Sequence, residues 1–115
     1  MDPEHAFSTD LLDEFAGTGS DAPERAARFL KSIAHRDRLK VLCSLIDGEL
    51  PVSRIEAMVG ASQSAVSQHL ARLRDEGILK SRRDGRQILY SIDDPTVLGM
   101  ITLLYQRFCG ESAGK

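Results

Sequence analysis

The chain has 115 residues, of which 42% are apolar and 5% aromatic, and its formal net charge is −2. This length fits one domain rather than two, and the scarcity of aromatic residues favours a mainly helical fold. No apolar run approaches the roughly 20 residues of a membrane-spanning helix, and the acidic N-terminus does not resemble a signal peptide. We therefore expect a cytoplasmic protein without a membrane partner, in which both cysteines are thiols.

The charge is unevenly distributed along the chain. Residues 1–24 contain seven acidic residues and no Lys or Arg, so residues 25–115 have a formal charge of +5. A basic body behind an acidic arm is compatible with binding to DNA phosphates, although a mixed surface with a solubilising tail has the same composition.

The first expected helix begins at Asp2 and Pro3, and its apolar face contains Phe7, Leu11, Leu12 and Phe15. Residues 17–20 (GTGS) end it. We expect residues 1–20 to form an acidic arm or helix, residues 21–110 to form the one main domain, and residues 111–115 to form a tail.

The domain is expected to open with two helices. The first begins at Asp21, which forms a capping-box pair with Glu24. The second spans residues 36–46, with Cys43 at the edge of its core face. The predicted core residues of this second helix are Leu39, Leu42 and Ile46.

Two shorter helices, a hairpin and a last helix follow. The short helices span residues 52–59 and, after the N-cap Ser62, residues 63–76. An Asp84-Gly85 turn joins strands at residues 78–83 and 86–92, and Asp94-Pro95 opens a helix that runs to about residue 110. This order predicts a mainly α, winged helix-turn-helix fold.

The helix after Ser62 has the properties of a recognition helix, which enters the major groove. Val66, Leu70 and Leu73 form its buried stripe, while its opposite face has short, uncharged side chains that do not hold the helix away from the bases. Gln and Ser pair with base edges. We expect base contacts from Gln63, Ser64, Ser67 and Gln68. His69 either reaches a base or phosphate or packs on the hairpin as a boundary residue.

Three arginines surround the hairpin turn, namely Arg82, Arg83 and Arg86. Arginines at a protruding tip suit phosphates or a narrow minor groove, although a solvated hairpin has similar charge. The last helix is apolar around most of its circumference, which favours a two-fold homodimer over a helix buried within a monomer.

Three segments resemble the ArsR family of bacterial repressors: residues 34–39 (AHRDRL), 62–70 (SQSAVSQHL) and 73–79 (LRDEGIL). The resemblance covers nearly all of residues 21–110. It implies a homodimer that binds an inverted-repeat operator and leaves it when an inducer binds. No phosphate loop, nucleophile–base pair or cofactor motif is present, so we expect neither an enzyme nor a cofactor.

Many members of this family sense metals, but this sequence lacks the ligands of two family sites. Residues 49–53 (ELPVS) contain no thiol, and residues 95–115 contain no His. The three histidines, His5, His35 and His69, are scattered along the sequence. Because soft or borderline metals need convergent thiolates or imidazoles, we expect no metal at either family site.

Cys43 and Cys109 lie on the two helices expected near the dimer interface. Their separation resembles that in the persulfide-responsive branch of the family, which includes SqrR and BigR. This resemblance implies that reactive sulfur species join the two cysteines through a polysulfide or disulfide and weaken DNA binding. Nearby Lys40 and Arg107 are expected to favour the thiolates. A peroxide-responsive dithiol repressor, a metal sensor, and two structurally buried cysteines remain the alternatives.

Overall fold

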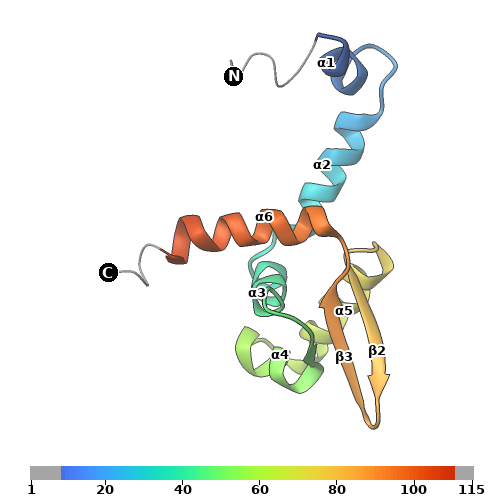
Figure 1. Ribbon diagram of the computed structural model, residues 1–115. Helices are drawn as coiled ribbons and strands as arrows, with labels where there is room; N and C mark the ends of the chain where they lie inside the picture. The colour runs from blue at the N-terminus through green and yellow to red at the C-terminus, as the bar shows by residue number, and fades with distance from the viewer. Residues whose placement is uncertain (1–8, 111–115) are drawn as a thin grey trace. The chain divides into compact units, whose positions relative to one another are not determined.

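The computed structural model describes residues 9–110, with side chains from Leu11 onward. The predicted helix start at Asp2 and Pro3, and Phe7, lie outside these residues. The chain divides into two units between Ala34 and His35, and the ribbon in Figure 1 shows the elements of each. No helix within residues 9–110 is long and apolar enough to cross a membrane.

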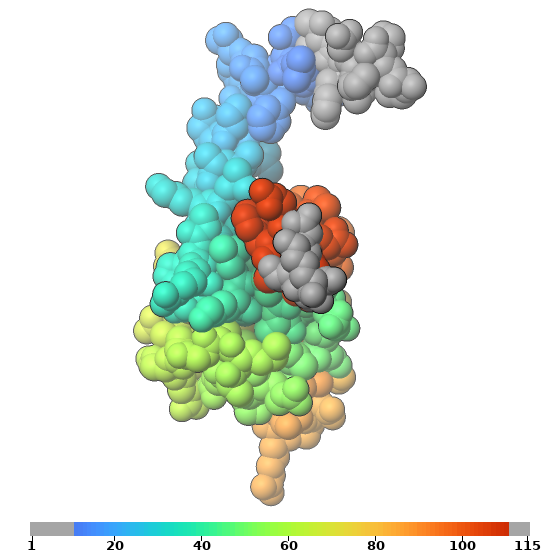
Figure 2. All heavy atoms as spheres, turned by 90° about the vertical axis from the view of Figure 1, so that its left-hand side faces the viewer, coloured from blue at the N-terminus to red at the C-terminus, as the bar shows by residue number. Residues whose placement is uncertain are grey.

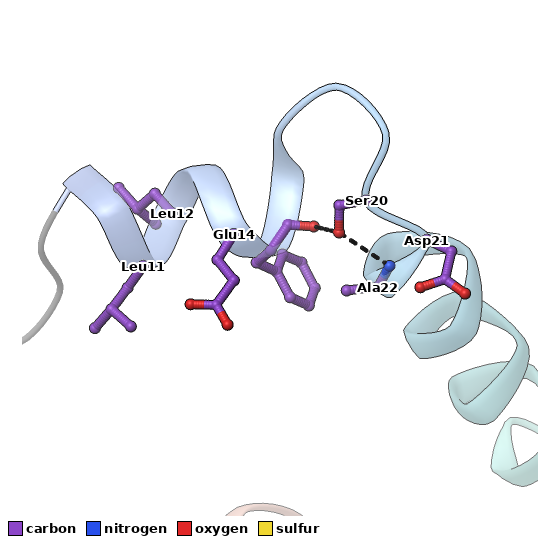
Figure 3. A pocket seen from close by; sticks show the side chains of 7 residues that line it. Leu11, Leu12, Glu14, Ser20, Asp21 and Ala22 are labelled. Atoms are coloured by element: carbon purple, nitrogen blue, oxygen red, sulfur yellow. Dashed lines mark hydrogen bonds between the residues drawn. The ribbon is translucent and has the colours of Figure 1, made fainter.

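The first unit consists of α1 (Thr9–Ala16) and α2 (Ala22–Ile33). Ser20 joins them, because its hydroxyl donates to the Phe15 carbonyl at 2.8 Å and accepts from the Ala22 N–H at 3.2 Å, as Figure 3 shows. The Asp21 side chain makes no capping hydrogen bond. The predicted capping box of Asp21 and Glu24 is therefore wrong, since the serine one position earlier satisfies the helix N-terminus.

The second unit contains four α-helices and a three-stranded antiparallel sheet. The helices are α3 (Arg36–Ser44), α4 (Val52–Val59), α5 (Gln63–Asp75) and α6 (Pro95–Tyr105), and a π-helical turn (Gln106–Gly110) continues α6. The strands are β1 (Leu50–Pro51), β2 (Leu79–Asp84) and β3 (Gln87–Ile92), in the order β1-β3-β2. The mainly α, winged helix-turn-helix prediction is confirmed.

The core of the second unit lies where α3 meets α4, α5 and α6. Side chains from all four helices and from the hairpin are buried there, and those of α5 are the predicted Val66, Leu70 and Leu73. The predicted core face of α3 is only partly correct, because Leu39 and Ile46 are half-buried. The helix ends at Ser44, so the chain turns and buries Leu45 instead, together with Val41 and Leu42.

The hairpin turn lies one residue later than predicted. Asp84 pairs with Gln87 at the end of the ladder, so the two connecting residues are Gly85 and Arg86. Gly85 has a φ of +64°, and a positive φ at the first central position is the requirement of a type II′ turn. The tip projects beyond the helices of its unit in both Figure 1 and Figure 2.

Most of the apolar surface of α6 is not covered within the described chain. Asp94 caps the helix by accepting from the Thr96 N–H at 2.8 Å, as its position predicts. Only Val97 and Ile101 are buried. The exposed apolar residues of α6 and the π-helical turn are Leu98, Leu103, Leu104, Tyr105 and Phe108. Among the described residues, this exposure does not support the alternative of a helix buried within a monomer.

Candidate nucleic-acid interface and thiol pair

Helix α5 presents a polar face to solvent and an apolar face to the core. Ser62 fixes its start, because the hydroxyl accepts a hydrogen bond from the Ala65 N–H at 3.1 Å. The predicted base-contacting residues are all exposed: Gln63, Ser64, Ser67 and Gln68. Their side chains are short, uncharged or amide-bearing, so this face can approach and hydrogen-bond to base edges.

His69 does not share this exposed face. Its Nδ1 accepts a hydrogen bond from Arg38 Nε at 3.3 Å, and its ring lies 4.8 Å from that of His35, centroid to centroid. Burial lowers the pKa of His69, and the neighbouring His35 and Arg38 lower it further. The neutral imidazole is therefore a half-buried part of the junction between α5 and α3.

The histidines are less scattered than their positions in the sequence suggest. His35 caps α3 by accepting from the Asp37 N–H at 3.1 Å, and one ligand atom each from His35, Asp37 and His69 lies within 4.8 Å of the other two. The fold therefore brings two imidazoles and one carboxylate close together at the junction of α3 and α5. The sequence did not reveal this cluster because His35 and His69 are 34 positions apart.

The three wing arginines have different surroundings. The Arg82 guanidinium binds the Glu49 carboxylate with two hydrogen bonds, one of them 2.9 Å from Nε to Oε2. These bonds lower the pKa of Glu49 and raise that of Arg82. Arg83 and Arg86 are exposed, and no ion pair of either is found among residues 11–110. The charges of Arg83 and Arg86 are therefore the most accessible to a ligand among those of the three wing arginines.

The two cysteines lie in the second unit, on either side of the contact between α3 and α6. Cys43 is in α3, which contacts α6, and Cys109 is in the π-helical turn that follows α6. Both are exposed free thiols. Partial removal of water raises the pKa of Cys43, and the negative charge of the Cys109 thiolate raises it further. The alternative that both are structurally buried cysteines is wrong.

The two basic residues near these cysteines contact other groups. Lys40 Nζ donates to the Val59 carbonyl at 3.3 Å, at the end of α4. The Arg107 guanidinium lies over the Phe108 ring at 5.0 Å. Since the pKa of Cys43 is raised, the expectation that Lys40 stabilises its thiolate is wrong.

Comparison with known proteins shows the family. The model for bacterial regulatory proteins of the arsR family matches residues 35–81. The transcriptional activator HlyU of Vibrio cholerae is 39% identical over 85 residues, which span 74% of this chain and 79% of HlyU. The biofilm growth-associated repressor of Xylella fastidiosa is 35% identical over 97 residues, which span 82% of this chain and 85% of that repressor.

Solved structures of related regulators have the same fold as this chain. BigR from Xylella fastidiosa has a TM-score of 0.70 at 34% identity, covering 76% of this chain and 89% of BigR. HlyU from Vibrio vulnificus has a TM-score of 0.75 at 35% identity, covering 88% of this chain and 100% of that structure. The chain is therefore a DNA-binding transcriptional regulator that belongs to the ArsR family.

Proposed function

We propose that this regulator is a cytoplasmic, homodimeric repressor that leaves its operator when reactive sulfur species bridge Cys43 and Cys109. The observation that carries the proposal is that Cys43 lies in α3, which packs against α6, while Cys109, 66 positions later, lies in the turn that continues α6. The charge of the Cys109 thiolate also raises the pKa of Cys43. Both are exposed to a sulfur donor. Repression, rather than activation, follows the Xylella fastidiosa relative, which is named a repressor.

A second copy of the chain would cover the exposed apolar face of α6. Leu103 and Phe108 are 66% and 67% exposed, which is costly for large apolar side chains in water. A two-fold dimer is the commonest way to bury such a surface. It would also supply two α5 helices for the two halves of an inverted repeat.

In the DNA complex, Gln63, Ser64, Ser67 and Gln68 would contact base edges. Arg83 and Arg86 would bind phosphates or the minor groove. Arg82 and His69 would join them only by giving up their contacts with Glu49 and Arg38.

The sulfur chemistry requires a persulfide of the form R–S–SH as its oxidant. The Cys109 thiolate attacks the outer sulfur and forms Cys109–S–SH, and R–S⁻ leaves. The Cys43 thiolate then attacks the sulfur bound to the Cys109 carbon, which forms a disulfide and releases HS⁻. If Cys43 already carries an extra sulfur, the same attack gives a trisulfide and HS⁻. The raised pKa of Cys43 keeps more of it as the neutral thiol, so the first attack is assigned to the other cysteine.

The bridge would tie α3 to the end of α6 and thereby bias the spacing of the two α5 helices in the dimer. The test combines mass spectrometry with operator titration of reduced, persulfide-treated and peroxide-treated protein. We expect sulfur between Cys43 and Cys109 and operator affinity lowered roughly 5–150-fold. A response to peroxide alone would identify a dithiol peroxide sensor instead. Release caused only by a metal ion would identify a metal sensor.

A further inference from the structure

The start of α3 and the middle of α5 bring three metal-binding groups together at one junction. His35 is the N-cap of α3, Asp37 is in its first turn, and His69 comes from α5. One ligand atom from each lies within 4.8 Å of the other two. The Asp37 side chain is 20% exposed and His69 is half-buried, so the cluster is shielded on the protein side and open on the side of His35.

We propose that His35, Asp37 and His69 bind one divalent transition-metal ion of the Zn²⁺, Co²⁺ or Ni²⁺ class, which joins α3 to α5. Imidazole nitrogen and carboxylate oxygen are ligands that such ions accept, and three protein ligands leave a position for water. This site is distinct from the two family positions considered above. It involves neither cysteine, so it does not depend on the thiol switch.

The geometry needs only side-chain adjustment to hold an ion. Metal–ligand bonds of about 2.0–2.1 Å place tetrahedral ligand atoms about 3.3 Å apart. The present separations of up to 4.8 Å must therefore shorten by about 1.5 Å at most. Rotation of the exposed His35 ring and of the Asp37 carboxylate can provide this change.

Binding must displace existing hydrogen bonds. The Nδ1 atoms of His35 and His69 accept from the Asp37 N–H and from Arg38 Nε, which places the ring protons on Nε2 in the metal-free chain. An ion that binds Nδ1 replaces those donors directly. An ion that binds Nε2 requires the proton to move to Nδ1, which then no longer accepts. In both cases Arg38 releases His69, so Arg38 competes with the metal.

Charge assigns a necessary role to Asp37. The N-terminus of α3 and the Arg38 guanidinium both oppose a cation at this junction. The Asp37 carboxylate is the one anionic group among the three ligands and offsets that repulsion. Removing the negative charge of Asp37 should therefore weaken metal binding more than removing an uncharged hydrogen-bonding group would.

The experiment uses the full chain with both cysteines replaced by Ser, because thiolates bind the same ions. After treatment with a chelator, the protein is titrated with Zn²⁺ by calorimetry and with Co²⁺ by visible absorption. We expect one ion per chain and a higher melting temperature with Zn²⁺. His69→Gln and Asp37→Asn should each weaken binding by more than about 100-fold, since even outer-shell changes cost 10–100-fold.

Two further variants separate ligation from folding. His35→Asn keeps an N-cap side chain but removes the imidazole, so it should lose Zn²⁺ binding while the metal-free melting temperature stays close to that of the parent. Arg38→Met should bind Zn²⁺ more tightly, because the competing donor and charge are gone. His5→Gln is the matched histidine control and should bind normally. Unchanged affinity in His69→Gln and His35→Asn, or no binding by the cysteine-free parent, would overturn the proposal.

Discussion

Arg82 and Glu49, 33 positions apart, are joined by two hydrogen bonds between a guanidinium and a carboxylate. The pair ties strand β2 of the wing to the segment just before β1. It also engages Arg82, which the sequence predicts to contact DNA. Because both side chains are substantially exposed, at 57% and 38%, the pair contributes little to folding stability and can exchange its carboxylate for a phosphate.

This pairing predicts unequal roles for the wing arginines. Arg83→Ala should weaken binding to all DNA sequences and reduce the slope of log K against log salt by about 0.9, because one phosphate contact is lost. Arg82→Ala should change that slope less in the parent protein. In a Glu49→Gln background, Arg82 is no longer held by the carboxylate and can bind a phosphate. There, Arg82→Ala should reduce the slope as much as Arg83→Ala does. Equal effects of Arg82→Ala in both backgrounds would contradict a competing role for Glu49.

The raised pKa of Cys43 predicts the pH dependence of its alkylation. The neutral thiol is favoured in the folded chain, so the iodoacetamide reaction of Cys43 should have its midpoint above that of a free cysteine. Cys109→Ser should move the midpoint downward, because the charge of Cys109 is one of the two causes. Because Cys43 is partly removed from water, the midpoint of its alkylation should still lie above that of the unfolded chain. Rates are measured by mass spectrometry on the peptide containing Cys43, and a midpoint unaffected by Cys109→Ser would show that the thiols do not interact.

The N-cap of the recognition helix predicts a stability effect. Ser62→Ala removes the acceptor of the Ala65 N–H and should lower the free energy of unfolding by about 1 kcal/mol. Ser62→Asp, which keeps an acceptor, should restore most of the loss. Urea unfolding of the two variants measures the difference, and Ser64→Ala, two positions later on the exposed face, is the control.

The exposed face of α6 predicts the effect of a charge on assembly. Leu103→Glu should convert a dimer into a monomer in analytical ultracentrifugation, since Leu103 is 66% exposed in the single chain and an unpaired charge is costly in an apolar interface. Met58→Glu is the control, because Met58 is 55% exposed and belongs to a different helix, α4. A dimer that tolerates Leu103→Glu would place the interface elsewhere.

Local chemistry made much of this fold predictable. Ser62 and Asp94 are caps whose hydrogen bonds reach only two or three residues along the chain, so the starts of α5 and α6 followed from the sequence. The one-residue error at the hairpin has a local cause too. Gly85 at positive φ is compatible with a turn at Asp84-Gly85 and with a turn at Gly85-Arg86. Only the pairing of Asp84 with Gln87 shows that the second turn is formed.

The contacts of the candidate site depend on distant residues and were less predictable. The pair of Arg82 with Glu49 and the junction of His69 with His35 join residues more than 30 positions apart, and neither has a local pattern. The direction of the Lys40 side chain is set by the Val59 carbonyl at the end of α4. Tertiary packing, rather than sequence neighbours, therefore determines which charges surround the Cys43 thiol.

The most direct test of the thiol switch is an operator titration by fluorescence anisotropy with parent, Cys43→Ser and Cys109→Ser proteins, before and after persulfide treatment. All three reduced proteins should bind with similar affinity, because serine preserves size and polarity. After treatment only the parent should lose affinity, roughly 5–150-fold, and reductant should restore it. Release of either serine variant by persulfide would contradict a switch that needs both thiols.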